Sequence, residues 1–396
     1  MRITNTLIAI VAVLGVTGLA STADATTAAQ FAKHPVGMAA LSPSTAALPF
    51  TPVDVTLGPG HRGLAVASTP YADNTTVYTS DTGGLHWTDV FSVRNLLTGA
   101  YWTNRTVQAI WVAGVADRPK PHDPQWFQPV LWHSTNGGRT WTHVIATVPR
   151  AAGFRTEGTE WTHLVWTTPR VGWATTTTGQ VLATVDGGRR WALVSAFGTH
   201  AIHQIEFVNG KDGWALSAST TTASSILWHT TNGGKTWQRQ RFADHVDALD
   251  FVSPTRGWAA GGTKSHGQWI RTIWSTTDSG HQWTAHDLGT VAYADEVMAG
   301  VTVSSPGVLW ATSGVGVNSP PVSAANQPLA PHLWVSDNGG RTWTSVTQPK
   351  SVSAVSLPQF VGPTAGWSLV LGALGPTAPE YLYQWQAARQ QWEPVK

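Results

Sequence analysis

The chain of 396 residues contains no cysteine, which excludes disulfide bonds, thiolate metal sites, lipid attachment at cysteine and a cysteine nucleophile. Charged residues are also scarce. They make up 12% of the chain, about half of the usual share, so surface ion pairs contribute little to solubility. The net charge of +2 comes from scattered Lys and Arg residues, which argues against a nucleic-acid-binding surface.

Apolar segments of near-membrane length are lacking everywhere except at the N-terminus. There, Arg2 precedes an uncharged apolar core over 7–20, and small residues follow up to Ala25. This layout predicts a secretory signal peptide over 1–25, cleaved after Ala25, and therefore a secreted or extracytoplasmic protein. The alternative is an uncleaved membrane anchor, for which the apolar core is short. Residues 26–52 are rich in Ala, Ser, Thr and Pro, which predicts a flexible tether.

Tryptophan, in contrast, is abundant: the chain has 23, and several of them are the last residue of a repeated eight-residue motif, which we call the octet. The octet begins at Ser80, Ser134, Thr184, Thr230, Thr276 and Ser336. Its third residue, usually Asp or Asn, can bond to nearby backbone N–H groups and close a turn, and its glycines allow positive φ. The predicted structural pairs of third residue and tryptophan are Asn136 and Trp141, Asp186 and Trp191, Asn232 and Trp237, Asp278 and Trp283, and Asn338 and Trp343. Six copies indicate a repeat protein.

A second marker alternates with the octet: an apolar segment, a short turn, and then Gly-Trp or a variant. Seven such markers divide 53–396 into units of four short strands. In the clearest unit the predicted strands are 202–208, 213–218, 225–231 and 236–242. The last unit has only a degenerate octet near Trp385 and Trp392. If the strands run from axis to rim, the chain starts on an inner strand and ends on an outer one, and part of the tether could add to a sheet.

The octet resembles the Asp box, Ser-x-Asp-x-Gly-x-x-Trp, of the BNR-type β-propellers. This group includes sialidases, oligoxyloglucan hydrolases, sortilin ectodomains and the photosystem II stability and assembly factor. The first copy departs from the pattern, because Thr82 stands in place of Asp or Asn. The resemblance implies an all-β fold: one seven-bladed propeller of four-stranded antiparallel blades, with Asp-box turns between the third and fourth strands. It does not choose among the activities of the group.

Candidate ligand-binding residues lie in two places on the predicted ring. Long loops join the second and third strands of two units, at Val115–Gln128 and Gly314–Pro331, on the face opposite the octets. The entrances and central positions of the inner strands carry polar residues that alternation turns toward the axial channel. The candidates are Trp126, Phe127, Glu160, Trp161, His203, Glu206, His245, Asp247, Asp250, Asp295 and Glu296. The structural alternatives are tolerated loop insertions and hydrated channel residues.

Two functions from different classes remain. Sialidases resemble this fold, but they need an Arg-Ile-Pro segment and a Tyr–Glu pair, and this chain has neither in a convincing form. A hydrolase that uses Glu206 and Asp250 as channel-mouth carboxylates remains the alternative, sialidase-like or xyloglucanase-like. We expect instead a non-catalytic binding or assembly scaffold, most similar to the photosystem II assembly factor group, although the arginine-rich patch of its photosynthetic members is lacking. The expected partner is an extracellular protein or glycan, and the chain is expected to be a monomer without a metal or cofactor.

Overall fold

The computed structural model describes a chain built from strands. The described residues are 37–38, 48, 52–58, 62–68, 75–82, 84–93, 96–102, 110–117, 127–149, 161–197, 202–218, 224–242, 244–292, 296–314, 333–347, 354–360, 366–371, 380–386, 389 and 391–395. Within them lie thirty β-strands and no α-helix. Accordingly, none of these residues belongs to a helix that could cross a membrane. The first 25 residues, the predicted signal peptide, lie outside the described part.

The described strands form seven sheets, each continuous in sequence apart from one added strand. The first is β2 (Pro52–Gly58), β3 (Arg62–Ser68), β4 (Thr75–Ser80) and β5 (Thr88–Val93). The second is β6 (Leu96–Trp102), β7 (Ile110–Asp117), β8 (Phe127–Ser134) and β9 (Thr142–Ile145). The third is β10 (Trp161–Trp166), β11 (Gly172–Thr176), β12 (Gln180–Thr184) and β13 (Ala192–Ala196).

The remaining sheets continue the pattern. The fourth is β14 (Ile202–Phe207), β15 (Gly213–Ala218), β16 (Ser225–Thr230) and β17 (Gln238–Arg241). The fifth is β18 (His245–Phe251), β19 (Gly257–Ser265), β20 (Gln268–Thr276) and β21 (Thr284–Val291). The sixth is β22 (Met298–Ser305), β23 (Val308–Ser313), β24 (Leu333–Ser336) and β25 (Thr344–Val346). The last has β26 (Ala354–Val355), β27 (Gln359–Phe360), β28 (Gly366–Leu371), β29 (Glu380–Gln386), β30 (Gln391–Pro394) and β1 (Gly37–Met38).

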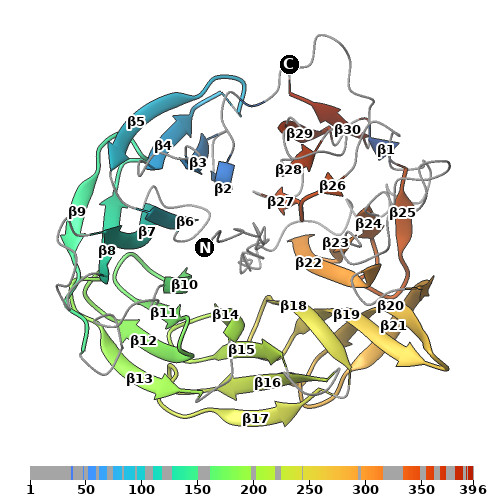
Figure 1. The fold of residues 1–396 in the computed structure, drawn as a ribbon. Helices are drawn as coiled ribbons and strands as arrows, with labels where there is room; N and C mark the ends of the chain where they lie inside the picture. The colour runs from blue at the N-terminus through green and yellow to red at the C-terminus, as the bar shows by residue number, and fades with distance from the viewer. Residues whose placement is uncertain are drawn as a thin grey trace, which may run out of the picture.

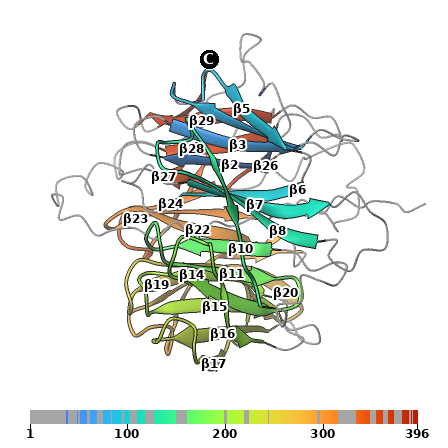
Figure 2. The same cartoon turned by 90° about the vertical axis from the view of Figure 1, so that its left-hand side faces the viewer.

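The sheets follow one another around a centre, with the first strand of each nearest the axis and the fourth at the rim (Figure 1). In side view the strands run across the thickness of the disc (Figure 2). The prediction of antiparallel four-stranded units is confirmed. In the fourth sheet the predicted strands agree with β14 to β17 to within two residues at each end. The apolar alternation and turn spacing therefore specified these elements well.

The last sheet departs from the pattern at both edges. Its innermost position is divided between β26 and β27, which both pair with β28. At its outer edge β1 pairs in parallel with β30, with Gly37 opposite Gln391 and Met38 opposite Trp392. The segment that the sequence predicted as a tether thus supplies a strand to the far end of the chain. An outer edge with unpaired N–H and C=O groups is covered in this way.

The octet turns share one hydrogen-bond pattern. In the second octet the Ser134 hydroxyl accepts a bond from Gly138 N at 2.8 Å, and the Asn136 side-chain oxygen accepts one from Thr140 N at 2.9 Å. The glycines after Asn136 have φ of 71° and 85°, a region that costs other residues energy. The closing Trp141 then donates its indole N–H to Gly138 O at 2.8 Å. The tryptophans of the second, fourth, fifth and sixth octets donate in this way, so these octets are self-bonded turns that the tryptophan closes.

In the third, fourth and fifth sheets the Gly-Trp marker has a separate role, which is to tie the sheet to the next one. Trp173, Trp214 and Trp258 donate their indole N–H groups to octet carbonyls of the following sheet, those of Gly233, Ser279 and Gly339. The distances are 3.0, 3.1 and 3.3 Å. Because an indole N–H buried without an acceptor is costly, this bond both satisfies the tryptophan and fixes the neighbouring turn.

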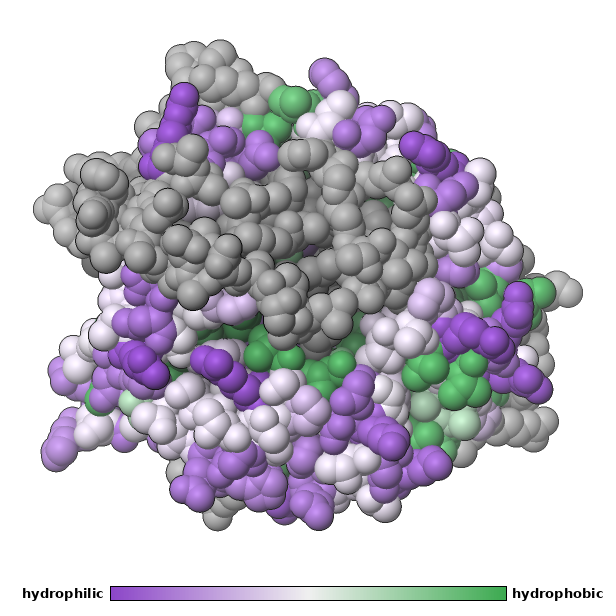
Figure 3. Space-filling model, turned by 180° about the vertical axis from the view of Figure 1, so that it is seen from behind, coloured by the Kyte–Doolittle hydropathy of each residue, from purple (hydrophilic) through white to green (hydrophobic). Residues whose placement is uncertain are grey.

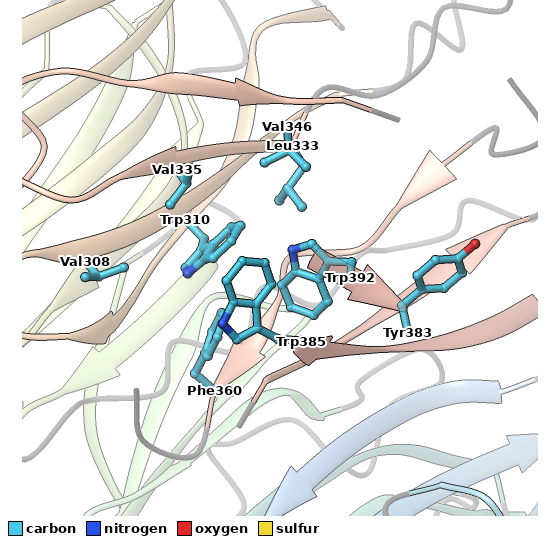
Figure 4. Close-up of a cluster of buried hydrophobic side chains, with 9 residues drawn as sticks. All are labelled: Val308, Trp310, Leu333, Val335, Val346, Phe360, Tyr383, Trp385 and Trp392. Carbon is cyan, nitrogen blue, oxygen red and sulfur yellow. The ribbon is translucent and has the colours of Figure 1, made fainter. Parts of the chain in front are cut away.

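The cores lie between neighbouring sheets. Figure 4 shows the cluster between the sixth and last sheets, where Trp310 packs against Trp385 and Trp392 with ring centroids 5.0 and 5.4 Å apart. Phe360 stacks on Trp310 at 5.4 Å. In the same way Trp237 of the fourth sheet packs on Phe197 at the end of the third. Aromatic pairs at such spacings add to the burial energy, so the tryptophans hold the sheets together face to face.

Candidate functional site

The inner strands share a bulge near their starts, and the bulge positions residues around the axis. The pairing register shifts between Ile202 and Gln204, and again between Val246 and Ala248. The residues inside these shifts are His203 and Asp247, both predicted site residues. A bulge turns a strand locally and re-aims the side chain at its extra position. The sequence alone gave no sign of this irregularity, because one inserted residue leaves the alternation on either side intact.

A row of histidines follows from these bulges, across the starts of β10, β14 and β18. His245 Nε2 lies 3.0 Å from Asp247 Oδ1, and the two side chains are 31% and 38% exposed. The Asp247 hydrogen bond outweighs burial and raises the pKa of His245. At His203 burial dominates over the nearby Asp247 charge and lowers the pKa. At His163 burial, with the His203 charge, lowers the pKa to about 4.

The row therefore contains histidines whose pKa values are shifted in opposite directions. His163 is neutral at neutral pH, and its Nδ1 lies 3.1 Å from the Thr175 hydroxyl. His245 holds a proton more readily because of Asp247, and its ring meets Trp269 edge to face at 6.0 Å. Trp269 lies on the long hairpin of β19 and β20, whose turn has positive φ at His266 and Gly267. The Gly257-Trp258 marker predicted the start of β19, and nothing in the sequence indicated how far this hairpin extends.

Glu206 and Asp250, predicted to face the channel, have different surroundings in the structure. Their residues are 0% and 1% exposed. Glu206 Oε1 accepts a hydrogen bond from Phe251 N at 2.8 Å, and Asp250 Oδ2 accepts one from Val303 N at 2.7 Å. Each bond joins one inner strand to the inner strand of the next sheet. Burial, with the Asp250 charge, raises the pKa of Glu206 well above its usual value.

Gln204 makes the same kind of tie, which the sequence did not indicate. Its side-chain amide donates to Leu249 O and its side-chain oxygen accepts from Leu249 N, both at 2.8 Å. Gln204 and Glu206 thus bond the backbone of β18 much as a neighbouring strand would. The two carboxylates and this amide connect neighbouring sheets, because one oxygen of each accepts a bond from a backbone N–H of the next sheet. Glu206 Oε2 is also buried and has no hydrogen-bond partner among the described residues.

Of the other predicted site residues, two are buried, one begins a strand and three lie outside the residues that the structure describes. Trp161 is 2% exposed and belongs to the core between the second and third sheets, 5.2 Å from Trp191. Glu296 is 6% exposed and its Oε2 accepts a bond from Ala292 N at 3.1 Å. Phe127 begins β8. Trp126, Glu160 and Asp295 lie outside the described residues, as do most of the two long loops.

The site as described brings together His203, His245 and Asp247 at the axis and separates them from the buried carboxylates. Among the described residues, no three His, Asp or Glu side chains are grouped closely enough to hold a metal ion. The accessible polar groups can donate and accept hydrogen bonds to a ligand. Glu206, whose pKa is raised by burial, is 0% exposed and bonded to Phe251 N, so its carboxyl group is not accessible to a substrate in this structure.

Comparison with known proteins identifies the fold. No protein-family model matches the chain, and no curated protein matches its sequence. The structure is similar to that of YCF48 bound to a D1 peptide, with a TM-score of 0.55 and 16% identity over 85% of this chain and 94% of that one. It is also similar to the GH74 xyloglucanase of Xanthomonas campestris, with a TM-score of 0.53 and 14% identity over 92% of this chain and 55% of that one.

A third similar structure is the β-propeller domain of the Trilobed protease from Pyrococcus furiosus, which has an open velcro topology. Its TM-score is 0.51, with 8% identity over 86% of this chain and 95% of that domain. The chain therefore has the β-propeller fold, as the sequence predicted. At these identities the similarity extends to the fold alone, since one fold carries many unrelated functions.

Proposed function

We propose that this chain is a secreted, non-catalytic β-propeller that acts as a binding or assembly scaffold for an extracellular protein or glycan, with a protein favoured. In this proposal the seven sheets are the blades of one ring, and the octets are Asp-box turns on one face. The propeller relative YCF48 was solved with a bound peptide, and this chain spans most of its length. A rigid disc held by inter-sheet bonds suits a protein whose task is to present a fixed surface.

The observation that carries the proposal is the burial of Glu206 and Asp250. Glycoside hydrolysis needs two carboxyl groups that reach a glycosidic bond and a water molecule. Here each carboxylate is about 0–1% exposed and bonds a backbone N–H of the next sheet. These are the residues on which the hydrolase alternative rested, and their geometry gives them a structural role instead.

A hydrolysis assay tests this function. The chain from 26 to 396 is incubated with tamarind xyloglucan and with sialyllactose, and the released sugars are quantified by chromatography. We expect no products above those of a heat-denatured sample. Turnover that is lost in Glu206→Gln or Asp250→Asn, while both variants keep the wild-type circular dichroism spectrum, would overturn the proposal in favour of the hydrolase.

The secretion proposal rests on the apolar core over 7–20 and the small residues before Thr26. Expression of the full chain in a bacterium, followed by N-terminal sequencing of the protein recovered outside the cytoplasm, tests it. We expect the mature chain to begin at Thr26. A full-length chain retained in the membrane fraction would show that the segment is an anchor instead.

A further inference from the structure

A groove between the third and fourth sheets combines aliphatic walls with a cationic border. Its volume is about 760 Å³, within the range of ligand sites. Val171, Val185 and Val194 come from the third sheet and its turns. Lys211 and Lys235 come from turns of the fourth sheet. The groove runs beside the third and fourth octets, at the opposite ends of the strands from the histidine row.

The third octet differs from the other five at two positions, and both line this groove. Its second residue is Val185, where the other octets have Asp81, Thr135, Thr231, Thr277 and Asp337. Val185 is 72% exposed, one of three large apolar residues that stand out as exposed among the described ones. Its seventh residue is Arg190, where the others have His86, Thr140, Thr236, Gln282 and Thr342. An aliphatic residue and a cation have thus replaced mostly polar, uncharged residues.

The turn holds Arg190 in place while leaving it accessible. Asp186 Oδ2 accepts a bond from Arg190 Nε at 2.9 Å, and the Arg190 side chain is 83% exposed. In the neighbouring octet, Asn232 uses its amide to donate to Thr236 at 2.7 Å instead. Burial opposes ionisation of Asp186, but the bonds from Arg190 and Thr184 outweigh it and lower its pKa to about 2. The anchored carboxylate leaves the guanidinium NH₂ groups directed at solvent.

The charges that line the groove are those of Arg190, Lys211, Lys235 and Asp186, so they sum to +2 from three positive groups and one negative group. The two tryptophans in the lining, Trp173 and Trp191, are 2% and 5% exposed. A sugar ring would therefore find no open aromatic face to stack on. Aliphatic walls with a cationic border complement an apolar side chain next to a carboxylate. Figure 3 shows one face of the molecule, on which apolar residues gather near the centre and toward one side while the rest of the coloured surface is mostly hydrophilic or intermediate.

We propose that this groove binds an extended acidic peptide segment of a partner protein, with an aliphatic side chain against Val185 and a carboxylate at Arg190 and Lys235. The inference rests on the proposed scaffold function and names its partner chemistry and its contact surface. Arg190 supplies a planar fork for a carboxylate, and Lys235 supplies a second positive charge from the adjacent sheet. Because both sheets contribute, the site exists only in the assembled propeller.

Fluorescence anisotropy with a labelled synthetic peptide tests the inference. The probe is Glu-Val-Asp-Leu-Glu-Val-Asp with blocked ends, and the comparison peptide has Gln and Asn in place of the acids. The protein is the chain from 26 to 396. We expect the acidic probe to bind and the neutral peptide to bind roughly tenfold more weakly. Binding of the acidic probe should weaken as salt is raised from 50 to 300 mM.

Three variants locate the site. Arg190→Thr combined with Lys235→Thr should weaken the acidic probe roughly tenfold, and Val185→Thr should weaken both peptides about threefold. Threonine is native at the octet positions of Val185 and Arg190 elsewhere in the chain, so these two changes suit the turn. Arg341→Thr, in the sixth octet and outside the groove, is the matched control and should bind like the wild type.

The outcomes distinguish this inference from the scaffold function. If the acidic probe binds the groove variants as tightly as the wild type, or does not bind at all, the groove assignment is wrong. The proposed non-catalytic function is not affected by that result. Binding of polygalacturonate in place of the peptide, with the same sensitivity to Arg190→Thr and Lys235→Thr, overturns the peptide as occupant. Sugar release in the hydrolysis assay overturns the scaffold function whatever the peptide does.

Discussion

The buried carboxyl group of Glu206 connects two neighbouring sheets. It is fully buried, its Oε1 accepts the Phe251 N–H at 2.8 Å, and the Asp250 carboxylate raises its pKa further. A protonated carboxyl can still accept that bond, so the tie between the sheets does not require a charge. Burying a charge at this position would cost far more than burying the neutral acid.

The pH dependence of stability follows from that raised pKa. The unfolded chain ionises Glu206 near pH 4.5 while the folded chain keeps it protonated, so its favourable contribution is complete below pH 4.5 and is lost as pH rises toward the folded pKa. Glu206→Gln keeps the acceptor and removes the ionisation. We expect equal stability of variant and wild type at pH 4. Above it, the variant should gain up to about 1.4 kcal/mol per pH unit until the folded pKa is passed.

Urea unfolding followed by tryptophan fluorescence, at pH 4, 5.5 and 7, measures this difference. Glu206→Ala is the control, because it lacks the acceptor for Phe251 N and should be destabilised by about 1–3 kcal/mol relative to Glu206→Gln at every pH. If the difference in unfolding free energy between the wild type and Glu206→Gln is the same at all three pH values, Glu206 ionises normally in the folded chain.

Among elements, the unit of construction is an octet turn plus the Gly-Trp strand of the preceding sheet. Trp214 stacks on Phe251 at 3.6 Å and donates its N–H to Ser279 O in the octet of the next sheet. Trp310 occupies the same marker position and is also buried, at 1% exposed, and it precedes a sheet without an intact octet. Among the described residues, the Trp310 N–H has no hydrogen-bond acceptor.

This contrast predicts how much the indole hydrogen bond contributes to the free energy of unfolding. Trp214→Phe should lower the free energy of unfolding by about 1–3 kcal/mol more than Trp310→Phe, because only the first change leaves a turn carbonyl without its donor. Both changes remove similar ring volume, so the packing loss largely cancels in the comparison. Chemical denaturation of the two variants measures it. Equal losses would show that the tie contributes nothing beyond packing.

Features that depend on neighbouring residues in the chain could be predicted from the sequence, whereas features that depend on contacts between distant segments could not. The glycines of the octets have the expected positive φ, since the turn itself demands it. The burial of Trp161 and Glu206 could not be predicted, because alternation gives the face of a strand but not the neighbour that covers it. The sequence allowed that part of the tether could add to a sheet, but it did not identify Gly37–Met38 or β30, since two residues carry no period and their partner is at the other end of the chain.

For the whole molecule, the question is how the first and last sheets meet. β2 contacts β27 across the join, and Gly84 of the first octet lies against Leu382 of β29. Octet glycines of the third, fourth and fifth sheets make a similar contact with the sheet before them, as Gly188 does with Leu131. The first and last sheets therefore meet through the kind of contact that joins these neighbouring sheets, with β1 added on the outer edge of the last sheet.

Substituting Gly84 tests whether this join stabilises the molecule. Gly84 has φ of 90°, and a Cβ there would collide with the Leu382 side chain. Gly267, with φ of 83° and open space around it, is the matched control for the backbone cost alone. That cost should be about 1–2 kcal/mol for Gly267→Ala, and Gly84→Ala should lose a further 1–3 kcal/mol, roughly, through overpacking. Thermal unfolding measures both losses, and amide exchange along β29 should accelerate in Gly84→Ala only. If the two variants lost the same stability and β29 kept its protection, the first octet would not be pressing on the last sheet, and other contacts would have to hold these two sheets together.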